Sequence, residues 1–86
     1  MRIQIDPHTL QRAKERGARE EEIEDVIHTG SPIPGKHGRK GKTRPYSFDR
    51  KRHGKHYDEK RIEVFYIEEK DGIITVTVYV FYGKWS

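Results

Sequence analysis

The sequence contains no cysteine, and only one methionine and one tryptophan, among its 86 residues. The lack of cysteine excludes a disulfide framework and a thiolate metal site, and it favours a cytoplasmic location. Long apolar runs are missing as well, since no segment approaches the ~20 residues that a membrane-spanning helix requires. Residues 1–7 are too polar for a signal peptide. We therefore expect a cytoplasmic protein that does not associate with a membrane.

Apolar residues are scarce throughout the chain. They make up 31% of it, against roughly 45–50% on a broader count in ordinary globular proteins, and charged residues reach 37% against about 25%. Such a composition is also found in disordered chains. Here, however, the apolar residues gather in three stretches with clear periodicity, which predicts a folded protein. A chain of this length buries only about 60% of its surface, so we expect one domain over residues 1–86 with a modest core.

Positive charge is concentrated in the middle of the chain. Residues 30–61 hold eleven Lys and Arg and three Asp and Glu, a net charge of +8, whereas the remainder carries −4, which gives +4 for the whole. An uneven distribution of this kind makes a dipolar surface that steers a polyanion to one face. RNA is the leading candidate for that polyanion.

A helical hairpin is predicted over about residues 7–29. Asp6 is suited to cap the first helix and Pro7 to open it, and Gly17 ends it because glycine accepts the left-handed conformation. The first helix should turn Leu10 and Ala13 inward. The second helix has three glutamates in its first turn, which the helix dipole favours. Its core stripe falls at i, i+3 and i+4, on Ile23, Val26 and Ile27.

Residues 30–43 are expected to form a basic loop, because they are rich in Gly, Pro and Lys and show no apolar periodicity. Antiparallel strands follow over about residues 44–82, with a hairpin turn at Asp71-Gly72. In the last strand, alternation sends one set of side chains toward the helices: Ile74, Val76, Val78 and Val80. The other set points away: Thr75, Thr77, Tyr79 and Phe81. The predicted fold class is α+β, with the helical hairpin packed on one face of a small antiparallel sheet; residues 2–5 are a candidate first strand.

The first helix carries a row of candidate functional residues, His8, Arg12 and Arg16, which share one face at a spacing of four. His8 lies in the first turn, where the helix dipole favours the neutral imidazole that a general base needs. The two arginines have the geometry to fork onto phosphate oxygens. The alternative is an ordinary solvated helix face.

The basic segment supplies the candidate contacts to nucleic acid. Its lysines and arginines would release counterions from phosphates, and its interleaved aromatic residues would stack on unpaired bases. The candidates are Lys36, Arg39, Lys40, Lys42, Arg44, Arg50, Lys51 and Arg52, with Arg61 beside them. The alternative is charge that serves only solubility.

Two further sequence patterns contain residue types that carry chemistry. The hydroxyl-rich face with Thr77 and Tyr79 would orient a nucleotide, or it is ordinary sheet surface. His53 and His56 lie three residues apart, but no third ligand is evident, so no metal site is expected. The sequence contains no phosphate loop, dinucleotide fingerprint or nucleophile elbow, and no cofactor is expected.

The element order and three segments of the chain resemble the RelE/ParE-like toxins and the wider group of small metal-independent ribonucleases. The segments are His8 to Gly17 (HTLQRAKERG), Glu20 to Ile27 (EEEIEDVI) and Ile74 to Tyr79 (ITVTVY). The chain looks closest to an uncharacterised branch whose members begin with a His-x-x-x-Arg-x-x-x-Arg-Gly helix. A Ser or Thr often precedes the second helix in the group, and Arg19 stands there in this chain.

This resemblance implies a four-stranded antiparallel sheet with two helices on one face and RNA cleavage on the other. It also implies an antitoxin partner, and the matching positions are His8, Arg12, Arg16, Arg61 and Thr77. The resulting hypothesis is a metal-independent endoribonuclease, a hydrolase acting on RNA with or without the ribosome, that belongs to a toxin–antitoxin pair. Its proposed catalytic residues are His8, Arg12, Arg61, Thr77 and Tyr79, with Arg44 as a further phosphate stabiliser. The alternatives are a nucleic-acid-binding module without activity, a protein-interaction subunit with an acidic partner, and a toxin that acts on gyrase.

Overall fold

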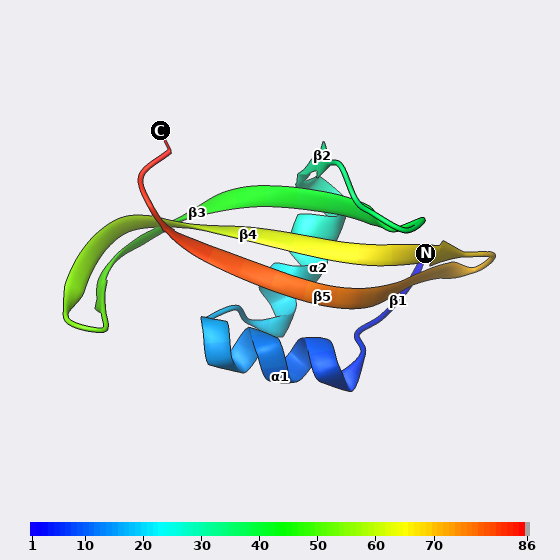
Figure 1. Cartoon of the computed structure of the whole chain (residues 1–86), viewed down its shortest axis with the longest axis horizontal. Helices are drawn as coiled ribbons and strands as arrows, with labels where there is room; N and C mark the ends of the chain where they lie inside the picture. The colour runs from blue at the N-terminus through cyan, green and yellow to red at the C-terminus, as the bar shows by residue number, and fades with distance from the viewer. Residues whose placement is uncertain (86) are drawn as a thin grey trace.

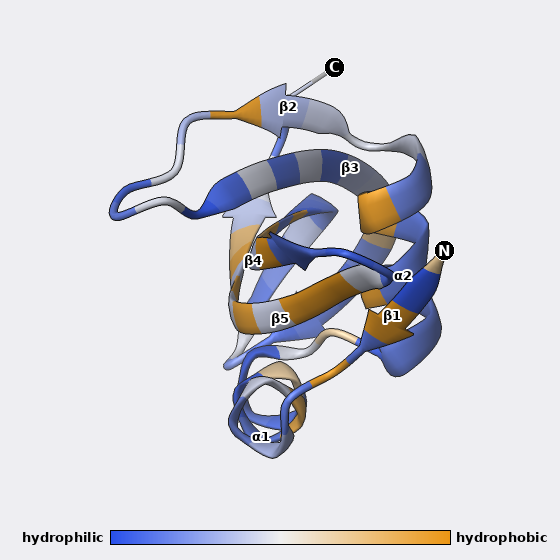
Figure 2. Ribbon diagram, turned by 90° about the vertical axis from the view of Figure 1, so that its right-hand side faces the viewer, coloured by the Kyte–Doolittle hydropathy of each residue, from blue (hydrophilic) through white to orange (hydrophobic). Residues whose placement is uncertain are grey.

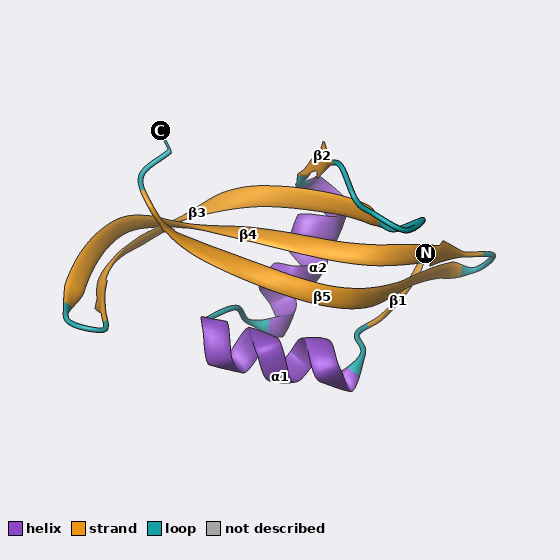
Figure 3. Ribbon diagram, viewed as in Figure 1, coloured by secondary structure: helices purple, strands orange, loops and turns teal. Residues whose placement is uncertain are grey.

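The computed structural model describes residues 1–85, and it is an α+β fold with two helices and one five-stranded mixed sheet (Figures 1 and 3). The sheet order is β1-β5-β4-β3-β2. All neighbouring strands are antiparallel except β1, which runs parallel to β5. The elements, in chain order, are β1 (Arg2–Gln4), α1 (Pro7–Arg16), α2 (Glu20–Thr29), β2 (Ser31–Ile33), β3 (Lys40–Arg52), β4 (Lys55–Glu69) and β5 (Gly72–Gly83).

Helix α1 begins and ends at the residues that the sequence indicated. The Asp6 side chain accepts a hydrogen bond from the backbone N of His8 at 2.9 Å, and Pro7 occupies the first turn. Gly17 follows the helix with φ of 94°, and its N–H donates to the carbonyl of Ala13. Only glycine adopts this conformation at little cost, so Gly17 fixes the point at which the chain turns toward α2.

Helix α2 begins without a Ser or Thr cap. The backbone N of Arg19 instead donates to Glu22 Oε1 at 2.9 Å, so the third residue of the helix satisfies the free amide before it. Ile23, Val26 and Ile27 are buried as predicted. From α1, Ala13 is buried in the core as predicted. The second residue that α1 buries fully is Thr9, whereas Leu10, which was expected to face inward, is only half-buried.

The expected basic loop over residues 30–43 is partly wrong. It contains strand β2 and the first residues of β3, and only the segment between Ile33 and Lys40 is a connection. The sequence did not reveal these strands because they are polar and charged, as the hydropathy colouring of β3 in Figure 2 makes plain. Backbone pairing with β4 holds β3 in the sheet, since a strand between two neighbours needs little apolar pattern of its own.

The structure adds two details to the expected antiparallel strands over residues 44–82. Only the two-residue turn His53-Gly54 separates β3 from β4, so these strands form one long hairpin. The sheet is mixed rather than purely antiparallel, because β1 pairs with the start of β5 in parallel. The hairpin turn at Asp71-Gly72 is confirmed, since β4 ends at Glu69 and β5 begins at Gly72.

A β-bulge changes the side-chain pattern of β5. The pairing skips Val76, because Phe65 faces Thr77 while Tyr66 faces Thr75. The extra residue reverses the alternation on its N-terminal side. Thr75 therefore lies toward the core at 2% exposure, whereas Ile74 pairs with Ile67 on the other side, so the predicted facing is wrong for these two residues. Val78 is buried and Val80 packs against the core, as predicted.

A single apolar cluster joins both helices to the sheet. Its members come from α1, α2, β4 and β5 and include Ala13, Ile23, Val26, Ile27, Ile62, Val64, Tyr66 and Val78. Helix α1 lies along β5, and α2 contacts β3 and β4 (Figure 1). Because the cluster occupies alternate positions of β4, the residues between them point to the opposite side of the sheet.

A candidate nucleic-acid interface

The side of the sheet away from the core cluster carries three cross-strand pairs between β4 and β5. Arg61 faces Phe81, Glu63 faces Tyr79 and Phe65 faces Thr77. We call these six side chains the outer face. Three of the predicted catalytic residues therefore lie on this side of the sheet. Thr77 and Tyr79 are on β5, and Arg61 is on β4, in the pair next to the Glu63–Tyr79 pair.

The outer face exposes aromatic rings. Tyr79 is 41% and Phe81 47% exposed, and their rings stack with centroids 6.5 Å apart. Phe65 meets Tyr79 edge to face, with ring centroids at 6.0 Å. Large aromatic side chains exposed on a solvent-facing sheet surface offer flat apolar area, which is the requirement for stacking on an unpaired base.

The loop between β2 and β3 brings positive charge to these rings. A pocket of about 220 Å³ is bounded on one side by Phe65, Thr77 and Tyr79 and on the other by Lys36 and Arg39. Neither Lys36 nor Arg39 makes an ion pair or a side-chain hydrogen bond within residues 1–85. The structure therefore unites two groups that the sequence could only propose separately, the hydroxyl-rich strand and the first cations of the basic segment.

Gly41 makes room for this arrangement. A Cβ atom at Gly41 would lie 2.8 Å from the Phe65 ring and 2.9 Å from Ile33 Cγ1, both closer than real Cβ contacts. Gly41 pairs with Phe65 across β3 and β4, so the ring lies over the glycine backbone. Any larger residue would displace Phe65 and, with it, one wall of the pocket.

Arg16 connects α1 to the outer face. Its Nη1 donates to the carbonyl of Val78 at 2.6 Å, and its guanidinium lies over the Tyr79 ring, 4.9 Å from the centroid. Strand β1 covers β5 only from Gly72 to Ile74, so the edge of β5 beyond it presents unpaired backbone groups. Arg16 satisfies one of them and places a positive charge beside the exposed aromatic rings.

Arg61 and Glu63 add a charged pair to the same face. Arg61 Nε donates to Thr43 Oγ1 at 2.9 Å and lies 3.9 Å from Glu63 Oε2. The Arg61 side chain is 34% exposed and that of Glu63 21%. Glu63 is flanked in register by Thr43 and Tyr79, so a carboxylate lies at the centre of the surface, next to an arginine and a phenol.

His8 and Arg12 lie further from this surface than Arg16. His8 is exposed in the first turn of α1, and its side chain has no hydrogen bond or ion pair within the described residues. Arg12 Nη1 contacts Glu15 Oε1 at 2.8 Å. Residues spaced by four are offset by about 40° around a helix, so the three side chains of the row do not point in one direction. No described contact joins His8 to Arg61, Thr77 or Tyr79.

Four cations of the basic segment point instead toward the helices or along the core side of the sheet. Lys42 Nζ donates to the carbonyl of Ile27 at 2.7 Å, and Arg44 Nη1 lies 3.2 Å from Asp25 Oδ2 and also contacts the Thr29 hydroxyl. Lys40 pairs with Glu68 at 2.9 Å, which raises the pKa of Lys40. Lys60 is fully enclosed. These side chains hold α2 and the strands together, so the number of cations available to a ligand is smaller than the sequence indicates.

The enclosed pair is Lys60 with Glu22, whose side chains are 6% and 7% exposed. Their Nζ to Oε1 distance is 2.9 Å, and Lys60 also donates to the carbonyl of Gly17. Burial raises the pKa of Glu22, but the hydrogen bonds from Lys60 and from the Arg19 backbone outweigh it and hold the pKa below its usual value. Nearby, Tyr46 donates to Asp25 Oδ2 at 2.5 Å, which lowers the pKa of Asp25, while burial and this bond raise that of Tyr46.

Residues 5–80 match the family described as Domain of unknown function (DUF4258). The chain belongs to this DUF4258 family. No curated protein and no solved structure matches it. Neither helix in residues 1–85 of this DUF4258 chain has the length and apolar character needed to cross a membrane.

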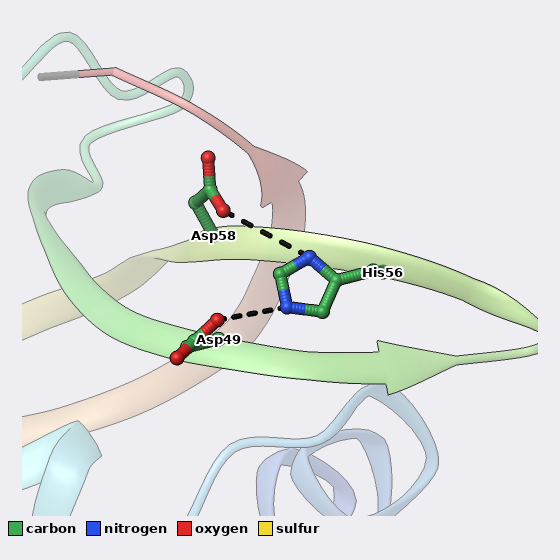
Figure 4. A group of neighbouring side chains, drawn as sticks. All are labelled: Asp49, His56 and Asp58. Carbon is green, nitrogen blue, oxygen red and sulfur yellow. Dashed lines mark hydrogen bonds and ion pairs between the residues drawn. The ribbon is translucent and has the colours of Figure 1, made fainter.

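One group of possible metal ligands lies on the β3–β4 hairpin of the DUF4258 chain. Single ligand atoms of Asp49, His56 and Asp58 all lie within 4.8 Å of one another, and all three residues are exposed. Figure 4 shows that the two ring nitrogens of His56 face different carboxylates, Asp49 at 2.8 Å and Asp58 at 3.8 Å. These contacts account for the grouping without an ion, and the expectation of no metal site stays a prediction.

Two features of the candidate site were missed in the sequence. Glu63 was not considered, although its place two residues after Arg61 in a predicted strand puts both on one side. The burial of Lys60 was not foreseen either. Alternation places Lys60 with Ile62 and Val64 only if the strand begins before residue 60, and β4 begins at Lys55.

Proposed function

We propose that this chain binds single-stranded RNA on the outer face of its sheet and cleaves it without a metal ion. The observation that carries the proposal is the pocket in which Lys36 and Arg39 meet Phe65, Thr77 and Tyr79. Exposed rings and unpaired cations side by side are the two requirements for holding an unstructured nucleic acid strand.

The binding step follows from the side chains. Bases stack on Tyr79 and Phe81, and phosphates lie against Lys36, Arg39 and the guanidinium of Arg16. Each stacked base contributes about 1–3 kcal/mol. The cations add a term that weakens as salt rises, because each neutralised phosphate releases counterions.

The cleavage step is attack of a ribose 2′-hydroxyl on the adjacent phosphorus, which expels the 5′-oxygen of the next nucleotide. It needs a proton acceptor at the hydroxyl, positive charge at the phosphate oxygens and a proton donor at the leaving oxygen. In this mechanism Arg61 stabilises the phosphate oxygens, and Glu63, whose Oε2 lies 3.9 Å from Arg61 Nε, accepts the proton. Thr77 and Tyr79 orient the nucleotide, and Tyr79 or His8 supplies the proton.

Incubation of the protein with single-stranded RNA in excess EDTA tests the proposal. We expect fragments that end in a 2′,3′-cyclic phosphate, because that group forms when the 2′-hydroxyl attacks. Intact RNA in both EDTA and magnesium buffers, over a range of protein concentrations, would exclude cleavage by the isolated chain.

A binding module without activity is the second candidate. The position of His8 favours it, since this imidazole has no described contact with the outer face. The same incubation separates the two: salt-sensitive RNA binding without fragments supports the module. An interaction subunit is supported instead if an acidic protein binds the outer face and RNA does not.

The resemblance to RelE/ParE-like toxins forms part of the proposal. It includes a helical hairpin packed on one face of the sheet, which the single core cluster supports. It also includes an acidic antitoxin that covers the exposed Tyr79 and Phe81. An antitoxin bound there competes with RNA, so a purified partner should displace labelled RNA in proportion to its concentration. Simultaneous binding of RNA and partner would contradict this part.

A further inference from the structure

The far end of the β3–β4 hairpin bends toward the helices and encloses a second groove. Figure 1 shows this end of the hairpin descending to the level of α1. The groove has a volume of about 550 Å³ and lies between the hairpin and the junction of α1 with α2. Its cationic lining comprises Lys14, Arg19, Arg50, Lys51, Arg52 and Lys60. It is separate from the outer face, with which it shares no residue.

Positive charge dominates this groove. Glu22 is its one acidic lining residue, and the buried pair with Lys60 neutralises it. Lys14 and Lys51 form no ion pair or side-chain hydrogen bond within residues 1–85. Arg52 is fixed from two sides, since its Nη2 donates to the carbonyl of Glu15 at 3.0 Å and its guanidinium stacks on Tyr82. Fixed and free cations around one hollow create a strong local attraction for a multivalent anion.

The aromatic rings of the groove are already covered. The guanidinium of Arg50 lies 4.9 Å from the centre of the Phe48 ring, and that of Arg52 lies 4.8 Å from the centre of Tyr82. The Tyr82 hydroxyl donates to the carbonyl of Arg16 at 2.6 Å. Both rings are half-buried, whereas Tyr79 and Phe81 on the outer face are exposed. The groove therefore offers guanidinium and ammonium groups to its ligand, and these match phosphate oxygens.

Backbone features of the hairpin create the groove. The pairing of β3 with β4 is irregular between Ser47 and Arg50, and Asp49 has a positive φ of 45°. Bulges of this kind bend a strand and change the direction of its side chains. The contact between His56 and Asp49, at 2.8 Å, ties the bulge to the opposite strand. Arg52 thus reaches the end of α1, while Arg50 and Lys51 remain exposed at the edge of the groove.

We propose that this groove is a phosphate-binding site that recognises a chain of phosphate groups without reading bases. The proposal does not depend on RNA cleavage or on the outer face. Two sources share the required chemistry, a free oligophosphate and the backbone of a nucleic acid strand.

Calorimetric titration with sodium tripolyphosphate is the first test, on the wild-type chain and on the double variant Lys14→Glu/Lys51→Glu. Both lysines are exposed and make no internal ion pair, so the variant should fold. We expect its affinity to fall by about tenfold or more, since two charges at the groove are reversed. The matched control is Arg2→Glu/Lys70→Glu, which makes the same change in net charge at exposed residues that line neither the groove nor the pocket of the outer face, and it should alter tripolyphosphate affinity less than about twofold.

A second arm identifies the source of the phosphates. A labelled RNA 12-mer is titrated into Tyr79→Ala/Phe81→Ala, whose stacking surface is removed, with and without the Lys14 and Lys51 substitutions. A further loss of affinity assigns the groove to the RNA backbone, and no loss alongside tripolyphosphate binding assigns it to a free oligophosphate. Equal losses in the groove variant and its matched control, absence of tripolyphosphate binding, or equal binding of polyglutamate would each overturn the proposal.

Discussion

Strands β3 and β4 carry basic residues on both of their sides, and the two sides differ in what holds the charge. On the side of the helices, Arg44 and Lys60 are paired with Asp25 and Glu22, and Lys42 caps the end of α2. On the other side, Arg61 donates to the Thr43 hydroxyl, and its nearest carboxylate, that of Glu63, lies 3.9 Å away. A run of positive charge in a strand is therefore divided between the two faces of the sheet, and only part of it lies on the outer face.

The outer face and the groove differ in the same way in their aromatic rings. Tyr79 and Phe81 expose 41% and 47% of their surface, although the Arg16 guanidinium lies over Tyr79, whereas Phe48 and Tyr82 are half-buried and each has an arginine over its ring. The outer face therefore exposes more aromatic surface than the groove does. We infer that the first surface selects unpaired bases and the second selects charge.

Loss of the proton acceptor is the change with the largest expected effect. Glu63→Gln should lower the rate of RNA cleavage by about 10²–10⁴-fold and leave RNA affinity nearly unchanged, since the amide keeps the shape but accepts no proton. Single-turnover rates with labelled RNA measure this. His8→Ala is the companion variant: a comparable loss assigns His8 as the proton donor, and full activity removes it from the mechanism.

Breaking the buried pair has the next largest expected effect, and it acts on stability. Glu22→Ala leaves Lys60 charged, enclosed and unpaired, so the free energy of unfolding should fall by about 3–5 kcal/mol in urea titrations. Glu22→Leu/Lys60→Met removes both charges and should lose much less. Equal losses in the two variants would mean that packing, and not the unpaired charge, determines the cost.

The same pair predicts the acid side of the stability profile. The hydrogen bonds from Lys60 and the Arg19 backbone hold the pKa of folded Glu22 below the ordinary glutamate value of 4.5, so the ionised carboxylate stabilises the fold above that pH. This contribution is lost as pH falls through the lower folded value. Urea titrations of Glu22→Gln should therefore show a flatter decline below about pH 4.5 than the wild type shows. A parallel decline in both proteins would remove Glu22 from acid unfolding.

Truncation of an exposed ring should weaken RNA binding more moderately. Tyr79→Ala removes one stacking surface and the partner of the Arg16 guanidinium, so affinity for single-stranded RNA should fall by about 1–3 kcal/mol. Fluorescence anisotropy measures the change. Tyr46→Phe is the control on the core side, because it loses the bond to Asp25 but touches no outer-face residue. Equal losses of RNA affinity in the two variants would mean that RNA binding does not depend on the outer face.

The smallest expected effect concerns salt dependence. Lys36→Gln/Arg39→Gln removes two unpaired cations from the pocket beside Tyr79. Log affinity falls as log salt rises, and the magnitude of this negative slope should become smaller by about 1.4. Arg44→Gln, which changes a cation bound to Asp25, should leave the slope within about 0.3 of the wild type. A larger change with Arg44→Gln would mean that the core-side cations also contact RNA.

The sequence predicted the helices well because their signals are local. Asp6, Pro7 and Gly17 define α1 through capping and backbone conformation alone. Strand β3 was underestimated, since neighbouring strands stabilise it and its own residues are polar. The bulge at Val76 could not be foreseen, because it depends on register with β4, and it reversed the facing of Thr75.

The candidate site was predictable in part. Thr77 and Tyr79 lie together on the outer face as the alternation indicated, and Lys36 and Arg39 reach them through a loop whose path no local pattern specifies. The pairing of Arg44 and Lys60 with acidic residues of α2 depends on how the helix packs on the sheet. Charge counts along a chain do not contain that information.

Residue-resolved NMR titration with a single-stranded RNA 12-mer tests the role of the outer face most directly. We predict chemical-shift changes that centre on Phe65, Thr77, Tyr79 and the 34–39 loop and that weaken as salt rises. Changes confined to other parts of the molecule, or spectra unaffected by RNA at millimolar concentration, would contradict RNA binding by this surface.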